Sequence, residues 1–581
     1  MSFLTLVGAP VVVALFLLPL RPHSLLAANN PQKAPEMKSS QGQEHAGLVL
    51  KNGVIYTGEA NRPRVEAVAT RGEWIVAAGS NKEVRSWIGP QTRVVDLKGR
   101  FAMPGFNDAH VHLVSAGLAR LQVDFLAAQS LAEFQQRIRD RLKDYKPGEW
   151  MTGRGWDHTL WPVKRFPTRQ DLDAVADDRP MVFGRVDGHV AVANSLALKL
   201  AGITKATPDP RGAHIVRDPA TGEPTGMLEE DAAMGMVWRQ IPAPTPEQLH
   251  RGIGLALREL AQNGVTSVQD NSVQEAGAWA AFAGYEQFMK EGKRTVRITE
   301  WLPFTAPLAD LEEMRRRGGT TDLWLKTGAL KGFLDGSLGS RTAALLAPYS
   351  DEPATSGILR MDPAETERLA IERDKAGFQI NFHAIGDRAN RLALDIFAAV
   401  CRENGSRDRR DRIEHAQVVA PADFARFADL AVIASMQPSH ETTDMRWAAE
   451  RLGPERSTGA YAWKTMLDRG VRLAFGTDYP VETINPMRGL HACVTRELPD
   501  GTPHGGWQPQ EKISIDDCIR AYTVGSAFAE FEESVKGTIA PKKLADIVVL
   551  SSDVTRVPPR QILRVETVMT IVGGRVVYEK K

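Results

Sequence analysis

The sequence predicts an α/β protein that combines a (β/α)8 TIM-like barrel, interrupted by an insertion, with a small β-sandwich domain built from both termini. Three observations indicate this architecture. The 581 residues are too many for one core of ordinary size. Short strand patterns separated by turn residues occupy residues 47 to about 99 and return in the last fifty residues. Between these two regions, strand and helix patterns alternate, which is typical of a parallel sheet.

The strand patterns at the two ends are too few to form stable sheets separately. The first region contains GLVLKNGVIYTG, VEAVATRGEWIVAAG and TRVVDLKG, and the last contains ADIVVLSSD and VETVMTIVGGRVVYE. We therefore expect residues 47–103 and 530–581 to form the two halves of one β-sandwich. The barrel, residues 104–529, lies between them in the chain.

The middle of the chain supplies the barrel strands. TPEQLHRGIGLALRELAQNG is an N-capped amphipathic helix with a terminal Gly, and the strand pattern VTSVQD follows it. Before residue 323 there are more candidate strands than a barrel needs, so we expect an insertion around residues 145–245. The later strand patterns are LWLKTGALK, GFQINFH, DRIEH, LAVIASMQ and VRLAFGTD.

The N-terminal segment indicates export to the periplasm or the exterior of a bacterium. Phe3 to Leu20 is almost wholly apolar, and Ala27 and Ala28 precede a polar stretch. This pattern predicts a signal peptide, residues 1–28, cleaved near Ala28, and a polar linker, residues 29–46. The apolar run is also near the lower length limit for spanning a bilayer. An uncleaved membrane anchor is therefore the alternative, and it would be the only membrane contact.

Composition excludes several classes of function. The chain has 72 Lys and Arg residues against 71 Asp and Glu residues, so no basic bias points to nucleic acid. Its three cysteines, Cys401, Cys493 and Cys518, are scattered and form no CxxC pair, which argues against a zinc finger and a disulfide framework. Nitrogen and oxygen ligands must therefore form any metal site. We expect a small-molecule substrate, and a homo-oligomer remains open.

The candidate site begins in the stretch FAMPGFNDAHVHL, residues 101–113. Side chains alternate in a strand, so His110 and His112 point the same way, as two metal ligands would. A strand with a polar face is the simpler explanation of this pair alone. However, further polar residues end other strand patterns, at the end of a barrel where active sites lie. These are Lys331, His383, His415 and Asp478.

This set resembles the amidohydrolase superfamily, and more narrowly its amidohydrolase 3 group of YtcJ-like and N-substituted formamide deformylase-like proteins. The resemblance extends from about residue 50 to the C-terminus. It rests on the stretches AMPGFNDAHVHL, RGWDHTLWPVKRFPTRQDLD, GHVAVANSLAL, LKGFLDGSLGSRTAAL, NFHAIGDRANRLALD, RIEHAQ, FGTDYPV and KGTIAPKKLADIVVL.

The resemblance implies a site for two divalent metal ions. His110, His112 and Asp478 would bind the more buried ion, and His383 and His415 the other. Lys331 would bridge the two ions after CO2 converts its amine to a carbamate, because a free ammonium has no lone pair to offer. Lys326 competes for this role, but on an unbroken strand it faces the opposite side. Zinc suits these ligands in a non-redox hydrolase, with iron or manganese as alternatives.

The resemblance also implies the reaction, which is hydrolysis of a non-peptide carbon–nitrogen amide bond, as in an N-substituted formamide or an acylated amine. A metal-activated hydroxide would attack, and Asp478 would shuttle its proton to the leaving nitrogen. Alternatives are an ester or lactone hydrolase, a deaminase, and an inactive homologue that only binds. Deaminases of the superfamily commonly use one metal and lack the bridging lysine. The expected substrate contacts are His189, Asp335, Arg341 and His440.

Overall fold

The computed structural model describes residues 45–126, 128–185, 190–210, 213–272 and 278–581. The predicted signal peptide and residues 29–44 of the predicted linker lie outside these ranges. Within them, no helix has both the length and the apolar character needed to cross a membrane.

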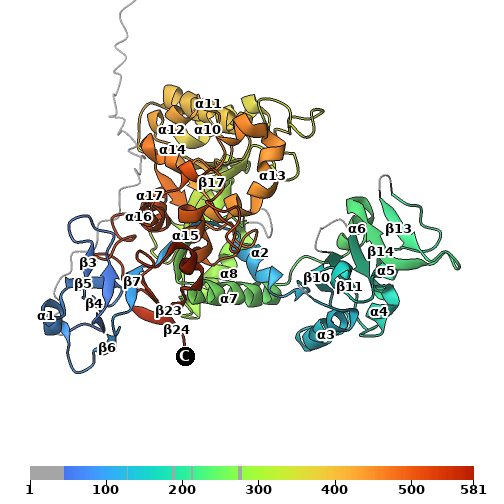
Figure 1. Ribbon diagram of the computed structural model, residues 1–581, viewed down its shortest axis with the longest axis horizontal. Coiled ribbons are helices and arrows are strands. Elements are labelled where there is room, and N and C mark those ends of the chain that lie inside the picture. Colours follow the sequence, from blue (N-terminus) through green and yellow to red (C-terminus); the bar gives the residue numbers. More distant parts are fainter. Residues whose placement is uncertain (1–44, 127, 186–189, 211–212, 273–277) are drawn as a thin grey trace, which may run out of the picture.

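Eight parallel strands form the central sheet, and each pairs with the next along the chain. The predicted TIM-like barrel is therefore confirmed. All residues of the first two strands are buried, as expected for strands covered by helices. The strands are β8 (Phe106–Val111), β15 (Val265–Asp270), β16 (Arg297–Pro303), β17 (Leu325–Phe333), β18 (Ile380–Ala384), β19 (Arg412–His415), β20 (Ile433–Met436) and β21 (Leu473–Phe475). One of them, β17, is labelled in the middle of Figure 1.

The first and last barrel strands meet at their carboxyl ends. The amide of Asp478 donates to the carbonyl of His110 at 2.8 Å, and the amide of His112 donates to the carbonyl of Tyr479 at 2.7 Å. Val111 and Tyr479 form a parallel bridge. These bonds nearly close the barrel, and they bring the loop after β21 against the paired histidines.

Helices cover the outside of the barrel. In α7 (Pro246–Gln262), Thr245 caps the first turn, and the face that carries Ile253, Leu257 and Leu260 is buried. The other helices that follow barrel strands are α2 (Leu113–Ala119), α8 (Ala278–Lys290), α9 (Leu308–Gly318), α10 (Pro363–Lys375), α11 (Asp387–Asn404), α12 (Phe424–Asp429), α13 (Pro438–Ser457), α14 (Trp463–Asp468), α15 (Pro486–Thr495) and α16 (Ile515–Arg520).

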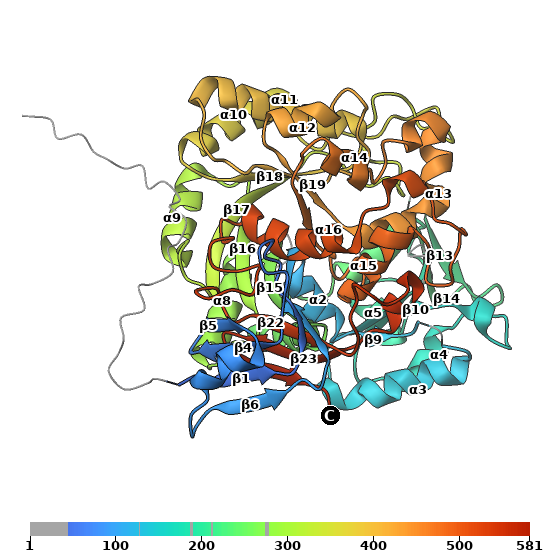
Figure 2. The ribbon, with the colours of Figure 1, turned by 60° about the vertical axis from the view of Figure 1, so that its left-hand side comes forward.

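Two sheets from the chain ends share one core. The four-stranded sheet contains β1 (Leu48–Lys51), β4 (Ala67–Arg71), β5 (Trp74–Gly79) and β6 (Arg93–Asp96). In the six-stranded sheet, β22 from the C-terminal region pairs antiparallel with β7, and Figure 2 shows the two regions side by side. The strands of this sheet are β2 (Val54–Tyr56), β3 (Arg64–Val65), β7 (Phe101–Pro104), β22 (Ile547–Leu550), β23 (Thr567–Val572) and β24 (Arg575–Glu579).

The β-sandwich lies at the amino ends of the barrel strands. Asp546, which precedes β22, forms an ion pair at 2.7 Å with Arg297, the first residue of β16. Both side chains are almost fully buried. The carboxyl ends of the barrel strands, where active sites form in this architecture, are therefore at the opposite end of the barrel.

A third unit follows the first barrel strand and stands to one side of the barrel in Figure 1. Its six-stranded sheet starts at Val123, earlier in the chain than residue 145, because β9 pairs with β10. The unit contacts the start of α7, where Gln248 donates to Glu149 at 2.7 Å. Its elements are β9 (Val123–Asp124), α3 (Leu131–Arg141), β10 (Met151–Trp156), α4 (Arg169–Asp173), β11 (Met181–Arg185), β12 (Val190–Ala193), α5 (Ser195–Leu200), β13 (His214–Arg217), β14 (Pro224–Glu229) and α6 (Glu230–Trp238).

One disulfide joins Cys493 in α15 to Cys518 in α16, while Cys401 is a free thiol. The scattered cysteines gave no sign of this pair in the sequence. The helices meet only in the fold, since 25 residues separate the two cysteines.

Candidate metal centre

The carboxyl ends of the barrel strands bring the six predicted ligands to one place. His110 lies in β8, and His112 directly follows that strand. Lys331 lies near the end of β17, and His383 near the end of β18. His415 ends β19, while Asp478 lies in the loop after β21.

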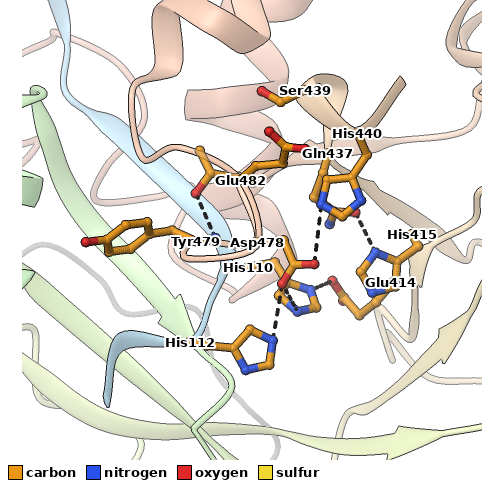
Figure 3. A network of polar contacts seen from close by, with 12 residues as sticks. His110, His112, Glu414, His415, Gln437, Ser439, His440, Asp478, Tyr479 and Glu482 are labelled. Atoms are coloured by element: carbon orange, nitrogen blue, oxygen red, sulfur yellow. Dashed lines mark hydrogen bonds and ion pairs between the residues drawn. The ribbon is translucent and has the colours of Figure 1, made fainter. Parts of the chain in front are cut away.

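Asp478 stands between several imidazoles (Figure 3). Its Oδ1 lies 3.5 Å from Nε2 of His110 and 3.2 Å from Nε2 of His112. Its Oδ2 lies 3.4 Å from Nε2 of His440. The two carboxylate oxygens therefore face different sets of histidines.

The opposite ring nitrogen of His110 is held by a buried carboxylate that the sequence analysis did not identify. Nδ1 of His110 lies 2.7 Å from Oε2 of Glu414, whose Oε1 lies 2.8 Å from Nε of Arg412. Such a contact fixes the ring and leaves Nε2 directed at the centre. The sequence signal was the alternation Arg412-Ile413-Glu414 in a short strand, which puts both charges on one face.

His415 and His383 are also oriented by neighbouring oxygens. Nδ1 of His415 lies 2.7 Å from Oε1 of Gln437, and Nε2 of His383 lies 2.9 Å from the carbonyl oxygen of Gly336. The ring centroids of His415 and His383 are 4.5 Å apart, and those of His415 and His110 are 5.1 Å apart. The imidazoles thus form one contiguous group.

The surroundings of the Lys331 amine differ from those of the Lys326 amine. The Lys331 amine is buried and has no hydrogen-bond partner among the described residues. It lies 4.8 Å from the ring centroid of Phe333 and 5.5 Å from that of Trp301. Burial lowers its pKa to about 8. Lys326 instead forms an ion pair at 2.5 Å with Glu532, so its charge is already compensated.

The backbone is strained at two of these positions. His415 and Asp478 have φ angles of 72° and 57°, in the left-handed region that L-residues seldom adopt. Residues held in this region commonly occur at functional sites, where the surrounding structure compensates their cost.

Burial largely sets the protonation states of the histidines at the centre. Together with neighbouring positive charges, it lowers the pKa of His383 to about 3, and it lowers those of His110 and His415 well below the usual range. Burial alone would raise the pKa of Asp478, but the close imidazole of His112, with those of His415 and His440, lowers it. Neutral imidazoles beside an ionised carboxylate are the forms that bind divalent metals.

The donor atoms fit a divalent metal ion. One ligand atom each from His110, His415 and Asp478 lie within 4.8 Å of one another, and all three residues are buried. Nε2 of His110 and Oδ1 of Asp478 have no hydrogen-bond partner among the described residues. Buried polar atoms left in this state are costly unless a ligand satisfies them.

The four predicted substrate contacts differ in position. His440 reaches the centre through Asp478. Asp335 also reaches it, because its Oδ1 lies 3.4 Å from Nε2 of His383, and its predicted contact with substrate is untested. Its carboxylate is fully buried and accepts hydrogen bonds from the amides of Ala344, Ile385 and Gly386 at 2.8–3.0 Å, so it fixes the loop after β17.

Arg341 lies further out, in an ion pair at 2.8 Å with Asp351. Its predicted contact with substrate is untested. His189 lies outside the described residues, so its predicted contact is untested too.

A sequence profile of the amidohydrolase family matches residues 93–578. The chain belongs to this family. It is therefore a metal-dependent hydrolase of the amidohydrolase superfamily, which confirms the resemblance drawn from the sequence motifs.

Curated relatives in the amidohydrolase family cover most of the chain. It is 35% identical over 92% of its length to Protein LONG AFTER FAR-RED 3 of Arabidopsis thaliana, covering 92% of that protein. It is 32% identical over 92% of its length to the putative amidohydrolase YtcJ of Bacillus subtilis, covering 99% of it. It is 28% identical over 92% of its length to N-substituted formamide deformylase of Arthrobacter pascens, covering 98% of it.

A solved structure agrees with this assignment. An uncharacterised metal-dependent hydrolase from Pyrococcus horikoshii is 30% identical, with a TM-score of 0.72 over 88% of this chain and 99% of the other. The amidohydrolase fold therefore extends over nearly all of the described chain.

Proposed function

We propose that this amidohydrolase cleaves a non-peptide carbon–nitrogen amide bond, with N-substituted formamides and acylated amines as substrates. The observation that carries the proposal is the buried amine of Lys331, which has no hydrogen-bond partner among the described residues and lies near His110, His383, His415 and Asp478. A bridging carbamate at Lys331 would explain why this amine is buried with no ion pair among those residues. The relative named N-substituted formamide deformylase supports the choice of substrate.

Two divalent ions, with zinc as the best fit to these donors, would occupy the centre. His110, His112 and Asp478 would hold one, His383 and His415 the other, and carboxylated Lys331 would bridge them. When bound, the ions would acidify a water molecule and polarise the substrate carbonyl.

Asp478 would move the proton. The lowered pKa keeps Asp478 ionised, so it would be free to accept the proton that the attacking water loses and pass it to the departing nitrogen. The protonated nitrogen then leaves as a neutral amine. Cleavage of the carbon–nitrogen bond requires this protonation, because an unprotonated amine nitrogen is a poor leaving group. Glu414 holds His110 in place during the reaction, and His440 would contact the substrate beside Asp478.

We propose that the protein is exported, with its signal peptide cleaved near Ala28, and that it acts on a small molecule in the bacterial periplasm or outside the cell. The disulfide between Cys493 and Cys518 supports an oxidising compartment. Contact with a membrane would be limited to an uncleaved N-terminal segment. A homo-oligomer is compatible with this proposal.

Elemental analysis of protein purified without added metal or chelator tests the centre. We expect about two divalent ions per chain, since the proposed ligand set serves two sites. The same sample would be screened against N-substituted formamides, N-acyl amines, esters and lactones, with released amine as the readout for the amides. One ion per chain, with release of ammonia from a ring, would favour the deaminase alternative. No metal uptake would favour the binding-protein alternative.

A further inference from the structure

A second acidic residue lies near Oδ2 of Asp478, the carboxylate oxygen that faces His440. Glu482 is four residues further along the loop between β21 and α15. Figure 3 shows its carboxyl group on the same side of Asp478 as His440. The side chain is half-buried, so a molecule entering the site can reach it.

The Glu482 carboxylate has little compensation for its charge. Among the described residues it accepts a hydrogen bond from Oγ1 of Thr443 at 2.7 Å, and no lysine or arginine forms an ion pair with it. The imidazole of His440 lies near it, and His440 also faces Asp478. The nearby Asp444 is satisfied differently, because Tyr461 donates a hydrogen bond to it at 2.5 Å.

The two oxygens of Asp478 indicate where the amine portion of the substrate lies. Oδ1 faces His110 and His112, which belong to the proposed metal site. Oδ2 is on the side of His440. A proton delivered to the departing nitrogen would come from Oδ2, so that nitrogen and its substituent would lie on the side where Glu482 stands.

We propose that Glu482 selects substrates whose amine portion carries a second, positively charged group, which pairs with the Glu482 carboxylate. This inference rests on the proposed amide hydrolysis and adds the class of amine. Water supplies hydroxide to the acyl carbon and a proton to the departing nitrogen. The cationic group keeps its charge throughout, so it serves only for binding.

Four formamides matched in length test the proposal. N-(2-aminoethyl)formamide and N-(3-aminopropyl)formamide are cationic, while N-propylformamide and N-butylformamide are their neutral counterparts. Released formate would be measured for the wild-type, E482Q and E482K holoenzymes. E450Q is the matched control, because it removes the same charge from an exposed site on α13.

We expect the wild type and E450Q to prefer the cationic pair. E482Q should lower kcat/KM for that pair at least about fivefold, mainly through KM, as a half-buried ion pair exceeds a surface pair in strength. Its kcat/KM for the neutral pair should change less than about twofold. E482K should reverse the preference and accept the anionic N-formyl-β-alanine. Equal losses for both pairs in E482Q, or a wild-type preference for neutral formamides, would overturn the proposal.

A binding measurement separates this inference from the proposed reaction. If the wild type turns over none of the four compounds, the formamide activity has failed. Calorimetric binding of the same compounds to the wild-type and E482Q holoenzymes then decides the role of Glu482. Tighter binding of the cationic pair that disappears in E482Q supports the inference, and equal binding of both pairs refutes it.

Discussion

Replacing Glu414 by Gln should loosen the metal centre without changing the shape of the side chain. The carboxylate lies between Nδ1 of His110, at 2.7 Å, and Nε of Arg412, at 2.8 Å. All three side chains are at most 1% exposed. An amide can still accept from His110, but its NH2 group would face the Arg412 donor, and the buried guanidinium would lose its counter-ion.

The structure sets the expected size of the effect. Removing one partner of a buried ion pair costs about 3–5 kcal/mol, and losing the group that orients a histidine ligand weakens metal binding roughly 10- to 100-fold. We expect E414Q to show both effects. E313Q is the control, because Glu313 pairs with Arg316 at the surface, where both side chains are more than half exposed. It should change neither property measurably.

Two assays check this prediction. Competition with a chromogenic chelator gives the metal affinity of each variant, and calorimetry of the metal-free proteins gives their thermal stability. The reasoning would be refuted if folded E414Q differed from the wild type in metal affinity and stability by no more than the control variant E313Q does. A loss of stability with unchanged metal affinity would mean that Glu414 stabilises the protein core and does not orient a metal ligand.

Four further predictions concern the centre and the disulfide. Asp478→Asn should abolish turnover of any substrate found while circular dichroism stays unchanged; an active variant would remove the proposed proton shuttle. Lys331→Ala should empty at least one metal position by elemental analysis, with partial rescue by short carboxylic acids, and two retained ions would require another bridging group. Metal uptake at a fixed CO2 pressure should rise through pH 8, because the Lys331 pKa of about 8 makes the neutral amine about tenfold more abundant at pH 9 than at pH 7; uptake independent of pH would argue against the carbamate. Cys493→Ser should lower the free energy of unfolding by about 3.5 kcal/mol in chemical denaturation, the loop-entropy value for a separation of 25 residues, and the free thiol variant Cys401→Ser is its control.

Local sequence patterns determined the class of fold and most of the candidate centre. Strand and helix alternation predicted the barrel, because a parallel sheet requires a crossover after each strand. The one-residue spacing of His110 and His112 put both on one face, because the side-chain period of a strand is two. The strand patterns GFQINFH and DRIEH placed His383 and His415 at strand ends, where the structure has them.

Other features depended on contacts between distant segments. The insertion sheet starts at β9 because that short strand pairs with β10, and α3 has the same pattern as a helix of the barrel. Similarly, the buried position of Asp335 follows from three amide donors, two of which lie about fifty residues away in the chain. No local pattern carries that information.

The sequence by itself determined which residue types reach the carboxyl end of the barrel, since strand periodicity and chain order are local properties. Only the tertiary structure decided what those residues do to one another. It gave Lys326 a carboxylate partner and left the amine of Lys331 without a hydrogen-bond partner in the described part of the chain. It also placed Glu414 behind His110 and Glu482 beside His440. The physical reason is that burial and charge compensation depend on neighbours from several strands of the barrel, and these neighbours meet only once the chain has folded.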